Sequence, residues 1–272
     1  MILALAAQAA GAEGPAVPAH PARVVSINLC TDQLAMLLAA PGQLVSVTWL
    51  AGDPAFSAMA DHAGAYLANG GRAEEVFALH PDLVLADIWS PPDTVSMLTR
   101  LGIPVVQFPP GESMADIRAN IIRMGEVLGT ADRAAAMAAA FDARLAGLVR
   151  LAPPPGARPR AATWAANAYA SGPRSLTGAI LDAAGFANVA GELGIEYGGT
   201  LPLEALVWAQ PDIVITAESA PGASRAEDVL RHPALAGLRV EAGLADADWT
   251  CGTPFVLDAV ARLAAFRAKP GP

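Results

Sequence analysis

Short runs of apolar residues alternate along the chain with stretches of helical periodicity. The runs are rich in Val, Ile and Leu, which is typical of strands covered on both faces. The predicted strands are residues 23–27, 44–49, 83–86, 105–108, 160–164 and 213–216. The predicted helices are residues 31–40, 74–79, 95–101, 113–128, 131–151, 176–184, 204–209 and 255–266. Strands separated by helices predict an α/β fold with parallel sheets.

One long helix divides the chain. Residues 131–151 contain no proline, and their larger apolar side chains recur every three or four positions. At 1.5 Å per residue the helix is about 30 Å long, enough to cross a domain. It stops at the sequence Pro-Pro-Pro-Gly of residues 153–156. We therefore predict an N-terminal lobe over residues 21–128, a linking helix over 129–152 and a C-terminal lobe over 153–272.

An internal repeat links the two lobes. Residues 74–85 and 204–215 each read as a glutamate, a short apolar helix, Pro-Asp and a buried strand, and a Gly-Gly pair precedes each copy. A fixed offset between similar segments indicates a duplicated structural unit. The two lobes are therefore expected to be alike. Trp208 falls inside the helix of the second copy and is expected in the core.

The charge balance excludes some classes of protein. The formal net charge of the 272 residues is −9, and Lys269 is the only lysine. Without a basic patch that neutralises phosphates, nucleic-acid binding is not expected. After the N-terminus, no apolar run reaches the roughly 18 residues that a membrane-spanning helix needs.

The N-terminus and the cysteines bear on the compartment. Residues 1–10 are apolar and small, and Ala7-Gln8-Ala9 fits a signal-peptidase site, so residues 1–20 are predicted to be a signal peptide and a flexible mature N-terminus. The alternative is a frayed terminus. Cys30 and Cys251 are the only cysteines, and in an exported protein they either form one disulfide or are two separate buried thiols.

Taken with the repeat and the long helix, two further segments carry a family resemblance. Residues 28–34 follow the first strand as a strand-to-helix loop, and Gly185-Phe186-Ala187-Asn188 ends the opening helix of the second lobe. With these features the chain, from residue 23 to 266, resembles the periplasmic binding proteins of ABC importers for metal chelates. The resemblance implies two Rossmann-like lobes, a rigid helical spine and a ligand cleft between the lobes. It also implies a soluble, periplasmic, monomeric protein without a resident cofactor or metal.

The resemblance assigns a role to the repeated glutamates. It implies that Glu74 and Glu204 meet arginines of the membrane permease through charge-assisted hydrogen bonds. Glu75 is a rival in the first lobe, but the register of the repeat selects Glu74. The alternative is that both glutamates only stabilise the first turn of a helix.

Aromatic residues in loops after strands are the candidate ligand contacts. Open α/β sheets bind ligands beyond the carboxyl ends of their strands, and aromatic rings suit a flat macrocycle. The ligand is expected to be a corrinoid such as cobalamin or a ferric siderophore, with haem bound through His62 or Tyr197 as the alternative. Arg72, Arg174 and Arg225 are candidates to face an anionic ligand. The predicted ligand-binding residues are Trp49, Trp89, Trp164, Tyr169, Tyr197 and Trp249.

Catalytic signatures are missing from the sequence. It contains no G-x-S-x-G, H-E-x-x-H or Walker A motif, and no G-x-G-x-x-G follows the first strand. An exported α/β enzyme is the rival, and it predicts ionisable residues with perturbed pKa values in the cleft. Asp32, Asp53 and Asp87 are possible members of such a set, although each stands where a polar cap is common. A two-lobed sensor without a permease is the other rival.

Overall fold

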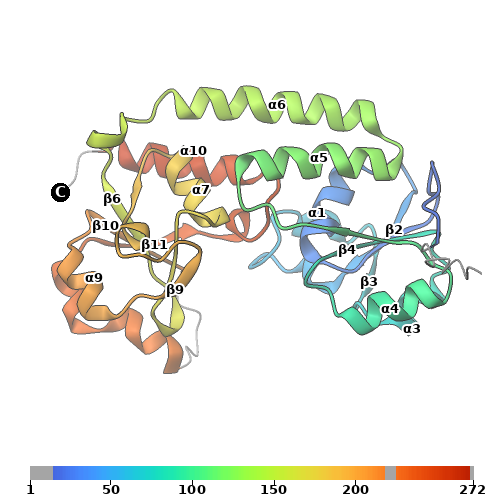
Figure 1. The fold of residues 1–272 in the computed structure, drawn as a ribbon, viewed down its shortest axis with the longest axis horizontal. Coiled ribbons are helices and arrows are strands. Elements are labelled where there is room, and N and C mark those ends of the chain that lie inside the picture. Colours follow the sequence, from blue (N-terminus) through green and yellow to red (C-terminus); the bar gives the residue numbers. More distant parts are fainter. Residues whose placement is uncertain (1–14, 218–224, 270–272) are drawn as a thin grey trace, which may run out of the picture.

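The computed structural model describes residues 15–217 and 225–269 (Figure 1). Two α/β lobes lie side by side, and α6 (Ala131–Val149) runs along one edge of the molecule over both. This helix lies inside the segment predicted to link the lobes. Most of the predicted signal peptide, residues 1–14, falls outside the described residues. In the described part, no helix combines the length and the apolar character that crossing a bilayer requires.

The N-terminal lobe is built on one parallel sheet in the order β3-β2-β1-β4-β5. From β1, the strands β2 and β3 are added on one side and β4 and β5 on the other. The carboxyl ends of β1 and β4 therefore form a topological switch point. The strands are β1 (Val24–Ser26), β2 (Leu44–Thr48), β3 (Leu67–Asn69), β4 (Leu83–Asp87) and β5 (Val105–Phe108). The helices are α1 (Leu29–Leu38), the 3-10 turn η1 (Trp49–Gly52), α2 (Ala60–Ala63), α3 (Ala73–Ala78), α4 (Pro92–Arg100) and α5 (Met114–Leu128).

The C-terminal lobe has a parallel sheet in the order β11-β10-β6-β8 and a separate antiparallel pair, β7 with β9. Its switch point lies between β6 and β10. The strands are β6 (Arg160–Thr163), β7 (Tyr169–Ser171), β8 (Ala187–Asn188), β9 (Gly198–Thr200), β10 (Ile213–Ala217) and β11 (Val240–Ala245). The helices are α7 (Leu176–Ala183), α8 (Val189–Glu192), α9 (Leu203–Ala209) and α10 (Val256–Arg267), with 3-10 turns η2 (Pro155–Ala157), η3 (Ala166–Ala168), η4 (Arg225–Arg231), η5 (Pro233–Gly237) and η6 (Ala247–Trp249). The predicted α/β class with two parallel-sheet lobes is confirmed.

A continuous apolar core joins the lobes. One cluster of buried side chains runs from Val24 and Leu85 in the first lobe, through Phe141 of α6, to Ile180 and Leu257 in the second. Helices α5 and α6 pack closely at Gly125, because a Cβ there would collide with that of Ala134. The two lobes are therefore held by packed side chains as well as by chain connectivity.

The aspartates of the repeated Pro-Asp segments make equivalent hydrogen bonds in the two lobes. The carboxylate of Asp82 accepts hydrogen bonds from the backbone N–H of Ala22 and of Arg23, just before β1. The carboxylate of Asp212 accepts one from the backbone N–H of Arg160, at the start of β6. Each aspartate therefore fixes the beginning of its lobe's first strand.

The strand-start arginines complete this repeat. The guanidinium of Arg23 donates to the carbonyl of Leu79, beyond α3, and that of Arg160 donates to the carbonyl of Ala209, which ends α9. The residues that follow, His80 and Gln210, are equivalent in the repeat and both are left-handed, with φ of 48° and 44°. The short helices α3 and α9 are thus tied to β1 and β6 in the same way.

Several local expectations are wrong. Helix α1 begins at Leu29 rather than at residue 31, because Asn28 supplies the N-cap. Trp208 is 90% exposed rather than in the core, because Leu206 is the α9 side chain that is fully buried. The sequence pattern also gave no sign of the short elements β3, β7, β8, β9, α2 and α8, or of β11.

Candidate functional site

A cavity of about 290 Å³ lies between the lobes. From the N-terminal lobe it is lined by the residues that follow β1, β4 and β5, at the carboxyl edge of the sheet and beside its switch point, where open α/β sheets place ligands. From the C-terminal lobe it is lined by the start of α7 and the loop before α10. The lining includes Asn28, Thr31, Asp87, Trp89, Phe108, Glu112, Asn120, Ser175, Leu176 and Thr250. We call this cavity the cleft.

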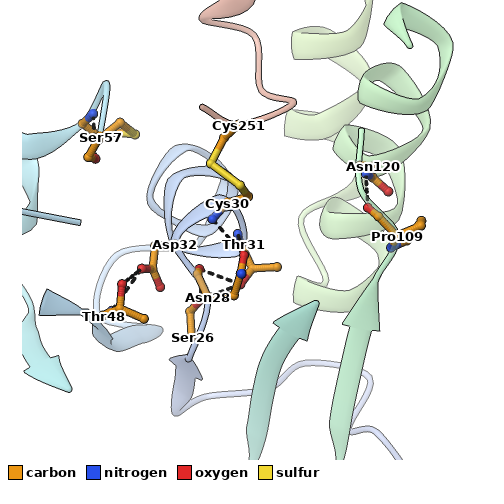
Figure 2. Close-up of a disulfide and its surroundings, with 11 residues drawn as sticks. Ser26, Asn28, Cys30, Thr31, Asp32, Thr48, Ser57, Pro109, Asn120 and Cys251 are labelled. Atoms are coloured by element: carbon orange, nitrogen blue, oxygen red, sulfur yellow. Dashed lines mark hydrogen bonds between the residues drawn. A yellow bond between two sulfur atoms is a disulfide. The ribbon is translucent and has the colours of Figure 1, made fainter. Parts of the chain in front are cut away.

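The floor of the cleft is where the lobes touch most closely. Cys30 of α1 and Cys251 before α10 form a disulfide across the lobes, with a Cα–Cα distance of 5.2 Å (Figure 2). Beside it, Gly111 faces Gly252, and a Cβ at Gly252 would lie only 2.7 Å from the Cα of Gly111. At the floor, a covalent bond therefore joins the lobes. Next to it, the two glycines touch so closely that no side chain has room there.

Polar side chains fix the backbone around the floor (Figure 2). The amide oxygen of Asn28 accepts hydrogen bonds from the backbone N–H of Cys30 (2.9 Å) and of Thr31 (3.3 Å), which starts α1 at the cleft. Across from them, the side-chain amide of Asn120 donates to the carbonyl of Pro109 at 2.9 Å. These bonds fix the lining segments of the N-terminal lobe before any ligand arrives.

Asp32 lies on α1 but points away from the cleft, toward β2 (Figure 2). One of its carboxylate oxygens accepts hydrogen bonds from the backbone N–H (3.0 Å) and the hydroxyl (2.5 Å) of Thr48. The other oxygen is buried with no partner among the described residues. Burial raises the pKa of Asp32 from 3.8 to about 7, and the hydrogen bonds from Thr48 offset only part of that rise. This perturbed carboxyl is behind the cleft rather than in it.

A second, smaller cavity of about 160 Å³ opens beside β6 and β10, at the switch point of the other sheet. Trp164, Tyr169 and Trp249 line it. Trp249 is 9% exposed, and its indole N–H is buried without an acceptor among the described residues. A buried donor left unpaired is costly to the fold.

Trp164 requires a correction. Its side chain has no exposed surface, and its indole N–H donates to the carbonyl of Leu201 at 3.0 Å within the core of the C-terminal lobe. The residue therefore supports the smaller cavity from behind and does not offer a surface to a ligand. Trp164 was predicted to end its strand, but β6 ends at Thr163, and the Trp164 side chain packs in the core.

The other predicted aromatic contacts are exposed. Trp89 lines the cleft and is 74% exposed. Trp49 begins η1 and lines neither cavity. Tyr169 lies over Gly198, where a Cβ would collide with its hydroxyl. Tyr197 is half exposed.

The basic candidates are more scattered. The guanidinium of Arg174 lies 4.8 Å from the centre of the Tyr197 ring. Arg72 and His62 are exposed and line neither the cleft nor the smaller cavity. The side chain of Arg225 lies outside the described residues. Within the described part, no group of three or more His, Cys, Asp or Glu residues is arranged to hold a metal ion.

Glu74 and Glu204 lie in the first turns of α3 and α9. These two helices lie at opposite ends of the molecule, both on the side away from α6 (Figure 1). Both side chains are exposed, and none of the ion pairs among the described residues includes either one. Glu75 instead accepts a hydrogen bond from the backbone N–H of Gly70 at 2.8 Å. Of the two neighbouring glutamates in α3, Glu75 is therefore used within the fold, and Glu74 has no ion-pair partner in the part of the chain that the structure describes. We call the exposed sides of α3 and α9 the docking face.

Comparison with known proteins identifies the family of the chain. The family described as periplasmic binding protein matches residues 24–242. Two cobalamin-binding proteins of Halobacterium salinarum strains are 33% identical over 151 residues, which is 55% of this chain but only 41% of their own length. The chain thus matches about two fifths of these relatives.

Solved structures share the fold. The periplasmic haem-binding protein RhuT of Roseiflexus superposes with a TM-score of 0.75 at 23% identity, over 89% of this chain and 96% of that one. The periplasmic vitamin B12-binding protein BtuF of Vibrio cholerae superposes with a TM-score of 0.68 at 18% identity, over 92% and 97% of the two chains. The family match and the shared two-lobed fold lead to one conclusion: the chain belongs to the periplasmic binding protein family.

Proposed function

We propose that the protein is an exported, monomeric binding protein that captures a metal chelate in the cleft and delivers it to the permease of an ABC importer. One observation carries the proposal: a cavity stands at the carboxyl edge of the larger sheet, at its switch point, and both lobes contribute to its walls. Members of the family are solute-binding proteins, and Asp32, the carboxyl whose pKa burial raises to about 7, is behind the cleft. Capture without chemistry is the function that fits this arrangement.

The lining favours a corrinoid over an anionic siderophore. Asp87 and Glu112 are the charged side chains among the described residues that line the cleft, and neither cavity is lined by Arg, Lys or His there. Carboxylates repel a carboxylate-rich or catecholate ligand but accept hydrogen bonds from amide groups. A corrin ring carries such amides on its edge and presents a flat face to Trp89. The naming of the archaeal relatives as cobalamin-binding proteins points the same way.

Haem is the second candidate, because of one pair of side chains. Tyrosinate is a known axial ligand of haem iron, and Tyr197 is half exposed with the Arg174 guanidinium against its ring. The same guanidinium can pair with a propionate of haem. Haem-binding proteins are among the solved structures with this fold.

Calorimetric titration of the mature protein with cyanocobalamin, haemin and ferrichrome tests these alternatives. We expect saturable one-to-one binding of cyanocobalamin. Trp89→Ala is expected to weaken it at least tenfold, because the exposed indole that lines the cleft supplies contact area at little entropy cost. Leu151→Ala, at an exposed apolar residue just beyond α6, is the control and is expected to leave the affinity unchanged.

Three other outcomes of this titration would change the proposed ligand. Tight binding of haemin, with a visible tyrosinate-to-iron band that Tyr197→Phe removes, would replace the corrinoid by haem. Binding of ferrichrome alone, an uncharged hydroxamate chelate, would replace the corrinoid by a siderophore. Failure of every chelate to bind would reject the proposed ligand class.

A further inference from the structure

The two carboxylates of the cleft both come from the N-terminal lobe. Asp87 ends β4, Glu112 lies in the loop between β5 and α5, and both line the cavity. Because β4 and β5 are adjacent strands of one sheet, the two residues belong to the same wall. The lining residues of the opposite wall are uncharged: Ser175, Leu176, Thr250 and Gly252. The charge of the cleft is therefore negative and lies on one side.

Asp87 is built into the turn that carries Trp89. One oxygen of its carboxylate accepts hydrogen bonds from the backbone N–H of Trp89 at 3.0 Å and from the hydroxyl of Ser90 at 2.8 Å. The backbone carbonyl of Asp87 accepts another from the side-chain amide of Gln107 on β5, at 2.9 Å. No ion pair among the described residues includes Asp87 or Glu112. The turn therefore holds one carboxylate beside the indole without a counter-charge.

Two arginines come near the cleft without lining it. The guanidinium of Arg123 lies 4.8 Å from the centre of the Phe108 ring, and Phe108 is a lining residue. Arg174 precedes the lining residue Ser175, and its guanidinium lies 4.8 Å from the centre of the Tyr197 ring. Both guanidinium groups are thus held against aromatic rings. The lining itself offers a ligand two carboxylates and no cation.

The helix ends at the cleft do not reverse this charge. Helices α1 and α7 begin at the lining, and a helix N-terminus favours an anion. The side chains of Asn28 and Ser175 already accept hydrogen bonds from backbone N–H groups of these first turns. Each helix end is equivalent to about half a unit charge. The two ends together therefore amount to about one positive charge, against the two negative charges of Asp87 and Glu112.

Charge separates corrinoids that share the same ring. A cobalt(III) corrin with one cyanide ligand carries one positive charge, and in cyanocobalamin the phosphodiester of the nucleotide arm cancels it. Cyano(aqua)cobinamide lacks that arm and keeps the positive charge. We propose that Asp87 and Glu112 make the cleft selective for cationic corrinoids without the phosphate-bearing arm, so that a cobinamide binds more tightly than a cobalamin. This selectivity rests on the proposed function.

Calorimetric titration of the mature protein with three corrinoids measures the selectivity. At about 20 mM salt, where charges are weakly screened, we expect the dissociation constant of cyano(aqua)cobinamide to be at least tenfold below that of cyanocobalamin. Aquacobalamin has the size of cyanocobalamin but one net positive charge, and its dissociation constant is expected to lie between the two. At about 500 mM salt the tenfold ratio is expected to fall at least threefold, because salt screens the carboxylates.

Neutral variants assign the selectivity to the two carboxylates. Asp87→Asn keeps a side-chain oxygen that accepts from Trp89 and Ser90, so it removes the charge and retains the turn. We expect Asp87→Asn and Glu112→Gln each to lower the ratio of the two dissociation constants at least threefold, and the double variant to bring it close to one. Glu126→Gln, at an exposed glutamate near the other end of α5, is the matched control and is expected to leave the ratio unchanged.

Three outcomes would overturn the inference and are distinguishable from one another. Equal dissociation constants for cobinamide and cobalamin would reject the selectivity and leave corrinoid binding standing. A preference for cobinamide that persists in the double variant would assign the preference to the smaller size of that ligand and remove the role of the carboxylates. Failure of every corrinoid to bind the natural protein would reject the corrinoid function, and the selectivity with it.

Discussion

Burial around the cleft gives Asp32 a titration that affects folding. Burial raises the pKa of this carboxyl to about 7, whereas in the unfolded chain an aspartate titrates near 3.9. Between these values the folded protein keeps a proton that the unfolded chain has lost. Asp32 therefore favours folding at low pH, and this contribution is lost as the pH rises from about 4 to about 7.

Asp32→Asn removes this titration while keeping an oxygen that accepts from Thr48. We expect the unfolding free energy of the variant, relative to the natural protein, to increase with pH across that window by up to about 1.4 kcal/mol per pH unit. Urea unfolding at several pH values between 4.5 and 7.5 measures the difference. Asp61→Asn, at an exposed aspartate, controls for the loss of one negative charge. Parallel pH profiles for the natural protein and Asp32→Asn would contradict the assignment.

Gly252 is the other single residue on which the cleft depends. A Cβ at this position meets backbone atoms of Gly111, 2.7 Å away, and backbone atoms do not rotate aside. We expect Gly252→Ala to push the lobes apart at the floor, to cost about 1–3 kcal/mol of stability and to weaken ligand binding. Chemical denaturation and calorimetry check both effects. Gly64→Ala, where a Cβ meets nothing within 4 Å, is expected to change neither.

The tryptophans show what a sequence can and cannot reveal about a site. Positions after strands correctly indicated that Trp89 reaches the cleft lining. The alternation of side chains along a strand does not say which face is covered at the end of β6. The burial of Trp164 could therefore not be predicted from the sequence. A seven-residue helix has too few turns to identify its buried stripe, so Trp208 was assigned to the wrong side. The packing of η5 beside α9 leaves Trp208 on the wall of a surface groove of about 670 Å³, which the sequence pattern does not show.

Among the secondary-structure elements, the duplicated helices α3 and α9 owe their position to hydrogen bonds at their ends. The side chain of Arg160 joins β6 to the last carbonyls of α9, at 2.7 Å and 3.3 Å, and also pairs with Glu192. Helices of six and seven residues are too short to be stable alone. These ties therefore set the direction in which the docking face presents its glutamates.

Removal of the tie should loosen α9 specifically. We expect Arg160→Ala to lower the unfolding free energy by about 1–2 kcal/mol, a range that allows for its partial exposure, and to speed amide hydrogen exchange in α9. Hydrogen-exchange mass spectrometry resolves the helix. Arg144→Ala breaks an exposed pair with Asp258 and is expected to leave exchange in α9 as it was. Equal exchange in the two variants would argue against the anchoring role.

The type of a secondary-structure element could be predicted from the sequence where the element is long or buried. The apolar runs of β2, β4, β5 and β10 and the periodic helices α5, α6 and α10 were all predicted within a few residues. The strands β3, β7, β8 and β9 have only two or three residues each. Segments this short show no alternation, and their pairing partners decide their conformation.

The two lobes together are restrained at three places: by α6, by the shared apolar core and by the floor of the cleft. The disulfide at the floor closes a loop of 221 residues. Such a bond restricts the unfolded chain, and in the chain-entropy view the effect grows with loop length.

Loss of the disulfide should weaken the whole fold. We expect Cys30→Ala/Cys251→Ala to lower the unfolding free energy by about 2–5 kcal/mol. Denaturation of the natural protein with and without reductant provides the same comparison without mutation, and reductant should not affect the double variant. Identical unfolding midpoints for reduced and oxidised natural protein would show that the bond contributes nothing.

The same restraints fix the distance between Glu74 and Glu204. Because the floor is covalently bonded, we expect the cleft to fill and empty with little change in the spacing of α3 and α9. A transporter would then meet nearly the same docking face on empty and loaded molecules. Empty molecules would occupy the transporter in competition with loaded ones. An amount of this protein above that of its ligand would therefore slow import rather than speed it.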